Sequence, residues 1–250
     1  MVAWLSVLSG VIGLLAAAIF WTLSVWSEER RARATTQAGT ALSAFAIWWG
    51  GIALVLAVRA FGALLTAVGV DDPTLLLTMM LFMLLPLTLA MAGLAHYSLY
   101  LFVGIERRAF VIGGSIILYA LATYALLASA PFAVELVGGA AVVVPADGFA
   151  SLLRVAAVAY AIVPAFAFFG FIRLYLHEPP PPARARVGGL LVTVFAWVIA
   201  AGIAAVAPPM WAAILPDLCV GVGALALWSR YRVAKRLESN LPKSAAAEAN

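Results

Sequence analysis

Residues 41–68 read ALSAFAIWWGGIALVLAVRAFGALLTAV, an apolar run that contains a single charged residue, Arg59. At about 1.5 Å per residue, a helix of this length crosses the ~30 Å hydrocarbon core of a bilayer. Comparable apolar runs recur along the whole 250-residue chain. They predict membrane-spanning helices near residues 2–26, 41–68, 75–103, 109–130, 150–175, 187–207 and 209–231.

The composition also indicates a membrane protein. Hydrophobic residues make up 66% of the chain, charged residues make up 10%, and the mean hydropathy is +1.09. A soluble domain has about 45–50% apolar residues, so a soluble enzyme, a disulfide scaffold and a disordered chain are excluded. We therefore predict an all-α integral membrane protein, a seven-transmembrane helix bundle over residues 1–232, followed by a short polar cytoplasmic tail over 233–250.

The charge distribution predicts how the bundle is oriented. With the N-terminus outside, every basic residue except Arg59 and Arg154 falls on the cytoplasmic side. Cytoplasmic loops carry an excess of Lys and Arg, so we expect a multi-pass protein of the cell membrane with a cytoplasmic C-terminus. The positive face is expected to attract anionic lipids of the bilayer rather than nucleic acid. The acidic residues assigned to the outer side are Asp71, Asp72, Glu135 and Asp147.

Two loops carry local signals. Residues 131–148, between the fourth and fifth apolar runs, read PFAVELVGGAAVVVPADG. The apolar stretches on either side of Gly138-Gly139 predict a short external β-hairpin, and the alternative is an irregular or re-entrant loop. The four prolines at 179–182 predict a stiff polyproline turn before the sixth helix.

The scarcity of reactive residues excludes several chemistries. Cys219 is the only cysteine, and His96 and His177 are the only histidines. These counts leave no intramolecular disulfide and too few ligands for bis-histidine haems or a zinc protease site. Lys235 and Lys243 both lie in the polar tail, so no lysine within the membrane is available for a retinal Schiff base. We predict no enzyme activity, no cofactor and no metal site.

Two charges inside the apolar runs are the main candidates for a ligand or ion site. Arg59 and Asp217 lie at similar depths from the outer ends of the second and seventh helices, roughly 12–13 Å. A charge in hydrocarbon costs at least about 2.5–3.5 kcal/mol on insertion scales, so mutual pairing is the cheapest arrangement. Three interpretations stay open: a gate or binding site, a structural salt bridge, and an Arg59 that extends alone to the surface.

Further polar and aromatic candidates lie in other spans. His96 and Tyr100 are four residues apart and share a helix face, so they are suited to bind a ligand or relay a proton. Tyr160 and Trp197 fall near mid-membrane, where they would line a pocket or pack in the core. For His96 the alternative is an ordinary interhelical contact.

Small residues repeat at helical spacing and predict close helix contacts, within the bundle or in a homo-oligomer. They are Ser9, Gly13 and Ala17 in the first helix and Ala196, Ala200 and Ala204 in the sixth.

Two classes of function fit these features. The first is transport of a small solute or ion through a polar site in the outer half of the bundle, which the opposite charges of Arg59 and Asp217 at matching depth favour. The alternative is a non-enzymatic sensor or structural subunit of a membrane complex, which acts through a separate cytoplasmic protein partner. Topology alone does not decide between them.

Overall fold

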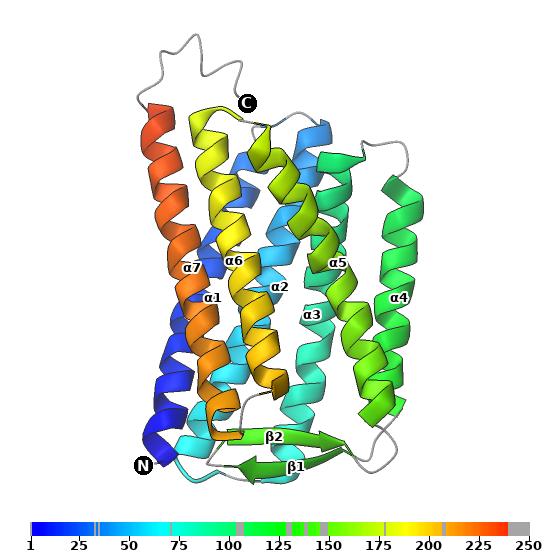
Figure 1. The fold of residues 1–250 in the computed structure, drawn as a ribbon, viewed down its shortest axis with the longest axis vertical. Helices are drawn as coiled ribbons and strands as arrows, with labels where there is room; N and C mark the ends of the chain where they lie inside the picture. Colours follow the sequence, from blue (N-terminus) through cyan, green and yellow to red (C-terminus); the bar gives the residue numbers. More distant parts are fainter. Residues whose placement is uncertain are drawn as a thin grey trace.

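The computed structural model describes residues 2–32, 34, 36–70, 72–103, 108–128, 132–137, 140–145, 150–177, 179–206 and 209–239. The helices run roughly side by side, and a small sheet lies across one end of them (Figure 1). Their bounds are α1 Val2–Arg31, α2 Thr36–Ala67, α3 Pro73–Phe102, α4 Arg108–Ala128, α5 Ala150–Leu176, α6 Pro181–Val206 and α7 Pro209–Ser239.

Four of the described helices are long and apolar enough to cross a membrane: α1, α2, α3 and α6. Large apolar side chains on the outside of the bundle point to the same environment. Trp4 is 77% exposed and Phe169 is 70% exposed. Such side chains lose nothing by exposure when the surroundings are lipid tails instead of water.

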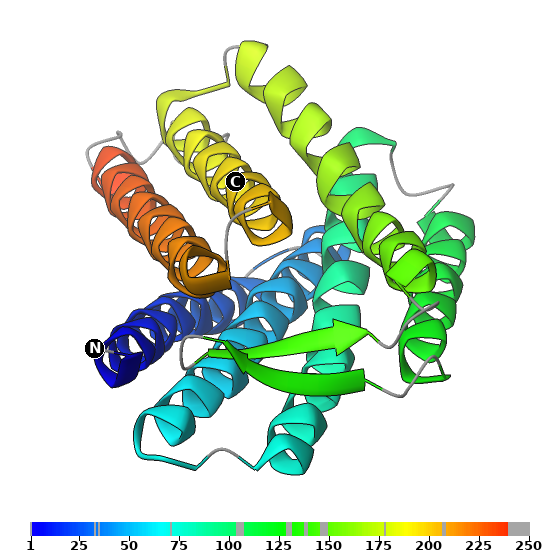
Figure 2. The same cartoon turned by 60° about the horizontal axis from the view of Figure 1, so that its bottom comes forward.

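Strands β1 (Phe132–Val137) and β2 (Ala140–Pro145) pair antiparallel, with Val137 opposite Ala140. This register leaves two residues for the connection between the strands. The sheet lies across the ends of the bundle, where β1 contacts α3 and β2 contacts α2 and α7 (Figure 2). We call this end of the molecule the sheet end.

The connection from α2 to α3 shows how the chain turns at the sheet end. Gly69 has a φ of +87°, and the Val70 N–H donates to the Leu65 carbonyl at 2.9 Å, so the last carbonyls of α2 are satisfied. The Asp72 carboxylate then accepts from the backbone N–H of Thr74 at 2.9 Å, which caps the start of α3.

The centre of the bundle is filled by an aromatic layer, which consists of Phe20, Phe45, Trp48, Trp49 and Trp197. The Phe20 and Trp49 rings stack at 5.0 Å between centroids, and those of Trp48 and Trp49 stack at 4.0 Å. Trp48 and Trp49 are fully buried. These rings come from α1, α2 and α6, so the layer joins helices that are distant in sequence.

Helices α2 and α3 pack closely beside this layer, and two glycines permit the contact. A Cβ added at Gly93 would lie 2.6 Å from the Ala44 carbonyl oxygen and 2.8 Å from the backbone nitrogen of Trp48. A Cβ at Gly51 would lie 2.7 Å from the Pro86 carbonyl oxygen. Backbone atoms cannot rotate away, so only glycine fits at these two crossings.

Two boundaries differ from the sequence predictions. Helix α6 begins at Pro181, so two of the four prolines form its first turn and the polyproline stretch is shorter than predicted. Proline suits that position because the first N–H groups of a helix have no helical partner. Helix α7 continues to Ser239 and buries Ala234, so residues 233–239 belong to the bundle and not to a tail.

We predict that Gly93→Ala lowers the stability of the protein by about 1–3 kcal/mol, because the added methyl group overlaps the backbone of α2. Gly113→Ala in α4 is the matched control, since a Cβ there meets no described atom within 4 Å. Thermal unfolding in detergent measures both. Equal melting temperatures for the two variants would contradict the close packing of α2 on α3.

Candidate functional site

The structure brings Arg59 and Asp217 together and adds a third residue, Ser9. The Arg59 Nε lies 3.0 Å from Asp217 Oδ1. The Ser9 hydroxyl donates to the other carboxylate oxygen of Asp217, Oδ2. Each residue comes from a different helix, α1, α2 or α7, and we refer to the three as the Asp217 cluster.

Small residues near the cluster let the three helices approach. A Cβ on Gly13 of α1 would lie 2.9 Å from the Ala60 Cβ of α2. A Cβ on Gly221, one turn after Asp217, would lie 2.8 Å from Ile12 of α1. The stripe of small residues predicted in the first helix therefore packs within the bundle, and its serine also supplies a hydrogen bond to the carboxylate.

Burial differs sharply between the two charges. The Asp217 side chain is 5% exposed, whereas Arg59 is 45% exposed. A buried carboxylate requires compensation, and here both of its oxygens have a partner. The Arg59 side chain is therefore partly exposed while its Nε stays in contact with the buried carboxylate, which the long side chain of arginine allows. The ion pair contradicts the interpretation in which Arg59 extends to the surface alone, although its side chain is partly exposed.

The other predicted site residues are not part of this cluster. Trp197 belongs to the aromatic layer, where its ring lies 6.0 Å from that of Phe20 and 6.3 Å from that of Trp49. His96 and Tyr100 are half-buried near the last turns of α3, away from the sheet end. The side chain of Tyr160, in α5, lies outside the described residues. Among the described side chains, no three His, Cys, Asp or Glu residues gather as metal ligands.

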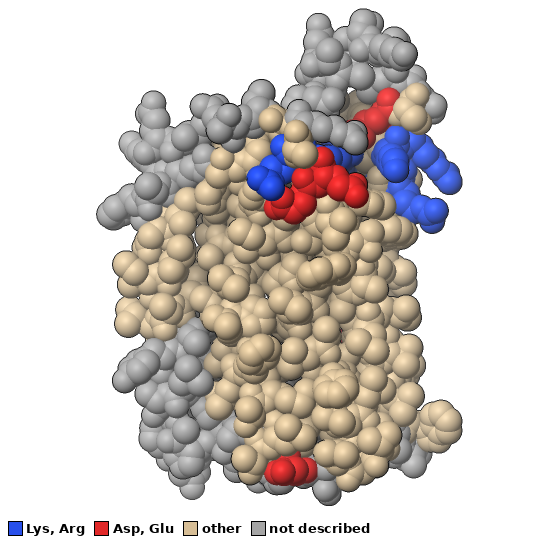
Figure 3. Space-filling model, turned by 180° about the vertical axis from the view of Figure 1, so that it is seen from behind, with Lys and Arg blue, Asp and Glu red and all other residues tan. Residues whose placement is uncertain are grey.

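Charged side chains gather at the end of the molecule opposite the sheet, which we call the basic end. Figure 3 shows basic and acidic groups there, a wide uncharged belt below them, and acidic atoms at the far end of the visible face. The described basic residues at this end of α1, α5, α6 and α7 are Arg30, Arg31, Arg173, Arg184, Arg186, Arg230, Arg232, Lys235 and Arg236.

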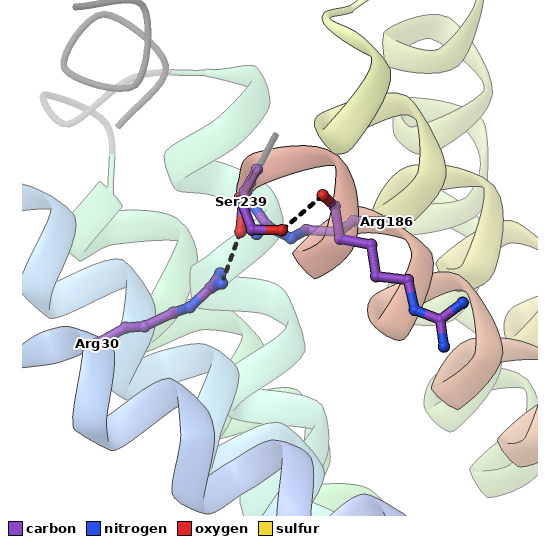
Figure 4. A network of polar contacts seen from close by, with 5 residues as sticks. Arg30, Arg186 and Ser239 are labelled. Atoms are coloured by element: carbon purple, nitrogen blue, oxygen red, sulfur yellow. Dashed lines mark hydrogen bonds and ion pairs between the residues drawn. The ribbon is translucent and has the colours of Figure 1, made fainter. Parts of the chain in front are cut away.

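A cavity of about 550 Å³ opens at the basic end, among α1, α2, α3, α6 and α7. Two guanidinium groups meet there on one carboxylate: Arg30 lies 3.3 Å from Glu238, and Arg186 also pairs with it. Figure 4 shows Arg30 and Arg186 converging on the end of α7, beside Ser239. The cavity is lined by Leu23, Trp26, Ser27, Glu29, Arg30, Leu42, Phe45, Tyr97, Arg186, Tyr231, Lys235, Glu238 and Ser239.

Sequence reasoning missed this cavity. It treated Arg30, Arg186 and Lys235 as markers of orientation, and it selected His96 and Tyr100 on α3, whereas Tyr97 lines the cavity. One signal was available: Glu238 is an acidic residue within a basic stretch and has opposite charges to pair with.

No family model, no curated protein and no solved structure matches the chain. The geometry of the described residues is therefore the basis for any proposal about function.

We predict that Arg59 and Asp217 are energetically coupled. Arg59→Gln and Asp217→Asn should each lower the free energy of unfolding. The double variant should lose about 1.5–3 kcal/mol less stability than the sum of the two single losses, because each single variant already removes the same charge-assisted contact. Free energies of unfolding in bicelles, measured for the four proteins of the cycle, give the coupling. A coupling energy near zero would mean that the two side chains do not interact in the membrane.

Proposed function

We propose that the chain is a multi-pass protein of the cell membrane, that α1 to α7 all cross the bilayer, and that the basic end faces the cytoplasm. The four long apolar helices and the uncharged belt support this proposal. The concentration of Arg and Lys at one end supports the orientation, because positive charge is retained on the cytoplasmic side. The N-terminus and the β1–β2 sheet would then be external.

We further propose that the protein transports a small solute or ion, with the Asp217 cluster acting as a gate in the outer half. The observation that carries this proposal is the pairing of the buried Asp217 carboxylate with Arg59 and Ser9 across three helices. A contact that consists of one ion pair and one hydrogen bond is readily broken by a proton or cation that neutralises the carboxylate.

The order of features along the helices supports an arrangement closed to the outside. On α1, Phe20 lies about 16 Å beyond Ser9, and Ser27 of the cavity lies about 10 Å further on. On α2, Trp49 lies about 15 Å beyond Arg59, and Leu42 of the cavity follows. The cluster, the aromatic layer and the cavity thus follow one another from the sheet end to the basic end.

The proline before Asp217 provides a way for the gate to move. Pro216 lies inside α7 and has no N–H, so the carbonyl one turn earlier lacks its helical hydrogen bond. Helices bend readily at such positions. We propose that release of Arg59 from Asp217 lets the first turns of α7 move relative to α1 and α2.

The second candidate is a sensor or structural subunit, and the dense core favours it. Phe20, Trp48 and Trp49 are fully buried, and Trp49 stacks on both of the other rings, which suits a rigid scaffold. In that case the Asp217 cluster would lock three helices together permanently, and the protein would act through a cytoplasmic partner.

We expect an Asp217-dependent flux when the purified protein is reconstituted in liposomes. Currents on a solid-supported membrane, with H⁺, Na⁺, K⁺, chloride, amino acids, organic acids and organic cations as probes, should fall at least tenfold in Asp217→Asn. Asp72→Asn is the matched control, since this exposed carboxylate only caps α3. If no probe gives a larger current with the wild type than with Asp217→Asn, the proposal that the protein transports these solutes or ions is wrong. A co-purifying partner would then favour the second candidate.

The proposed orientation is tested by cysteine labelling in a Cys219→Ala background. A cysteine at Ser239 should react with an impermeant maleimide only in inside-out vesicles, and one at Val68 only in right-side-out vesicles. The reverse pattern would place the basic end outside, and labelling of both from one side would exclude an odd number of crossings between them.

A further inference from the structure

The cavity at the basic end has the size and the lining of a ligand site. Its volume of about 550 Å³ lies within the ~300–1,000 Å³ range of small-molecule pockets. It is built by five helices, with polar groups at the helix ends and apolar groups deeper along α1 and α2.

The charges of the lining favour an anion. Arg30, Arg186 and Lys235 contribute three positive charges, against two carboxylates, Glu29 and Glu238. Glu238 alone holds both guanidiniums, with Oε2 on Arg30 and Oε1 on Arg186. A single carboxylate cannot saturate ten guanidinium N–H groups, and the Nε of Arg186 is buried with no described hydrogen-bond partner.

The rest of the lining suits an apolar or aromatic body attached to that anion. Leu23, Leu42 and Phe45 form apolar wall, and Trp26 contributes an indole whose ring centroid lies 5.6 Å from the Lys235 ammonium. Tyr97 and Tyr231 add phenol groups, which combine an apolar ring with a hydroxyl donor.

Among anions, a phosphate monoester fits best. A phosphate has three free oxygens and up to two negative charges, so it can bind two guanidinium forks at once, whereas a carboxylate has two oxygens and one charge. Basic pockets between membrane helices at the cytoplasmic face are typical sites for phosphate-bearing headgroups.

We propose that this cavity binds a phosphate monoester with an apolar body, and that the phosphate replaces Glu238 on Arg30 and Arg186. Glu238 is then a built-in competitor that closes the site when no ligand is present. The ligand would be either a lipid headgroup from the inner leaflet or a free phosphate monoester from the cytoplasm. The source of the ligand rests on the proposed orientation, in which the basic end faces the cytoplasm. The proposal does not depend on transport, because it concerns the opposite end of the bundle from the Asp217 cluster.

Two probes distinguish the sources. Phosphatidic acid, added to phosphatidylcholine nanodiscs that hold the full chain, represents the lipid, and binding is measured by native mass spectrometry. Phenyl phosphate represents the free monoester, and binding to the same nanodiscs without phosphatidic acid is measured by calorimetry. Binding of phosphatidic acid alone identifies a lipid site, and binding of phenyl phosphate identifies a site open to the cytoplasm. Binding of neither probe overturns the proposal.

The variants test the competition directly. Glu238→Gln should tighten binding about three- to tenfold, because the internal carboxylate no longer competes, and Arg186→Gln should weaken it about tenfold or more. Lys235→Gln, an exposed position, should weaken binding without the risk of misfolding. Arg31→Gln is the matched control, because Arg31 pairs with Glu28 and does not line the cavity.

The sign of the Glu238→Gln effect decides the proposal. A merely structural Glu238 would give weaker binding or none when it is replaced, since the two arginines would lose their support. If Glu238→Gln fails to tighten binding, or if Arg186→Gln and Lys235→Gln bind as the wild type does, the cavity is not a phosphate site with Glu238 as its competitor.

Discussion

A carboxylate inside an apolar bundle has to be compensated, and much of this structure is arranged around that requirement. Asp217 is buried, and its two oxygens are held by Ser9 and Arg59 from two other helices. The contact forces α1, α2 and α7 to a common depth, and the glycines beside it allow the backbones to come close enough. Along α1 and α2 the aromatic layer and then the basic-end cavity follow this contact, in the direction away from the sheet end.

A carboxylate held by side chains from other helices recurs at the basic end, but there the positive charges outnumber the negative one. At the Asp217 cluster, one carboxylate is held by one guanidinium and one hydroxyl. Glu238 is one carboxylate between two guanidiniums, with a cavity beside it. The first contact is close to neutral and suits a closed state, whereas the second leaves positive charge and unsatisfied donors. The two ends are therefore suited to different tasks.

Hydropathy located the helices well, because apolar length is the dominant signal in such a chain. The similar depths of Arg59 and Asp217 in their helices made an ion pair one of the predicted arrangements, and the structure contains it. Hydropathy did not reveal Ser9 as a partner, since serine in a small-residue stripe looks the same whether it packs or donates. It ended the last helix near residue 231, because a hydropathy pattern stops where charges begin. Helix α7 instead continues through these charges to Ser239, and its Glu238 pairs with Arg30 and Arg186. Helical periodicity grouped His96 with Tyr100 but could not tell that Tyr97 lines the cavity. Those features depend on how helices rotate against one another, which a single sequence does not encode locally.

The Asp217 cluster also has a consequence for biosynthesis. Ser9 and Asp217 are 208 residues apart, and so are Arg30 and Glu238. At about 5–20 residues per second, some 10–40 s of translation separate the synthesis of Ser9 from that of Asp217. During this interval Arg59 is in the nascent chain without the carboxylate that neutralises it. In the proposed membrane topology, Arg59 therefore has to be accommodated without its carboxylate partner until α7 has been made.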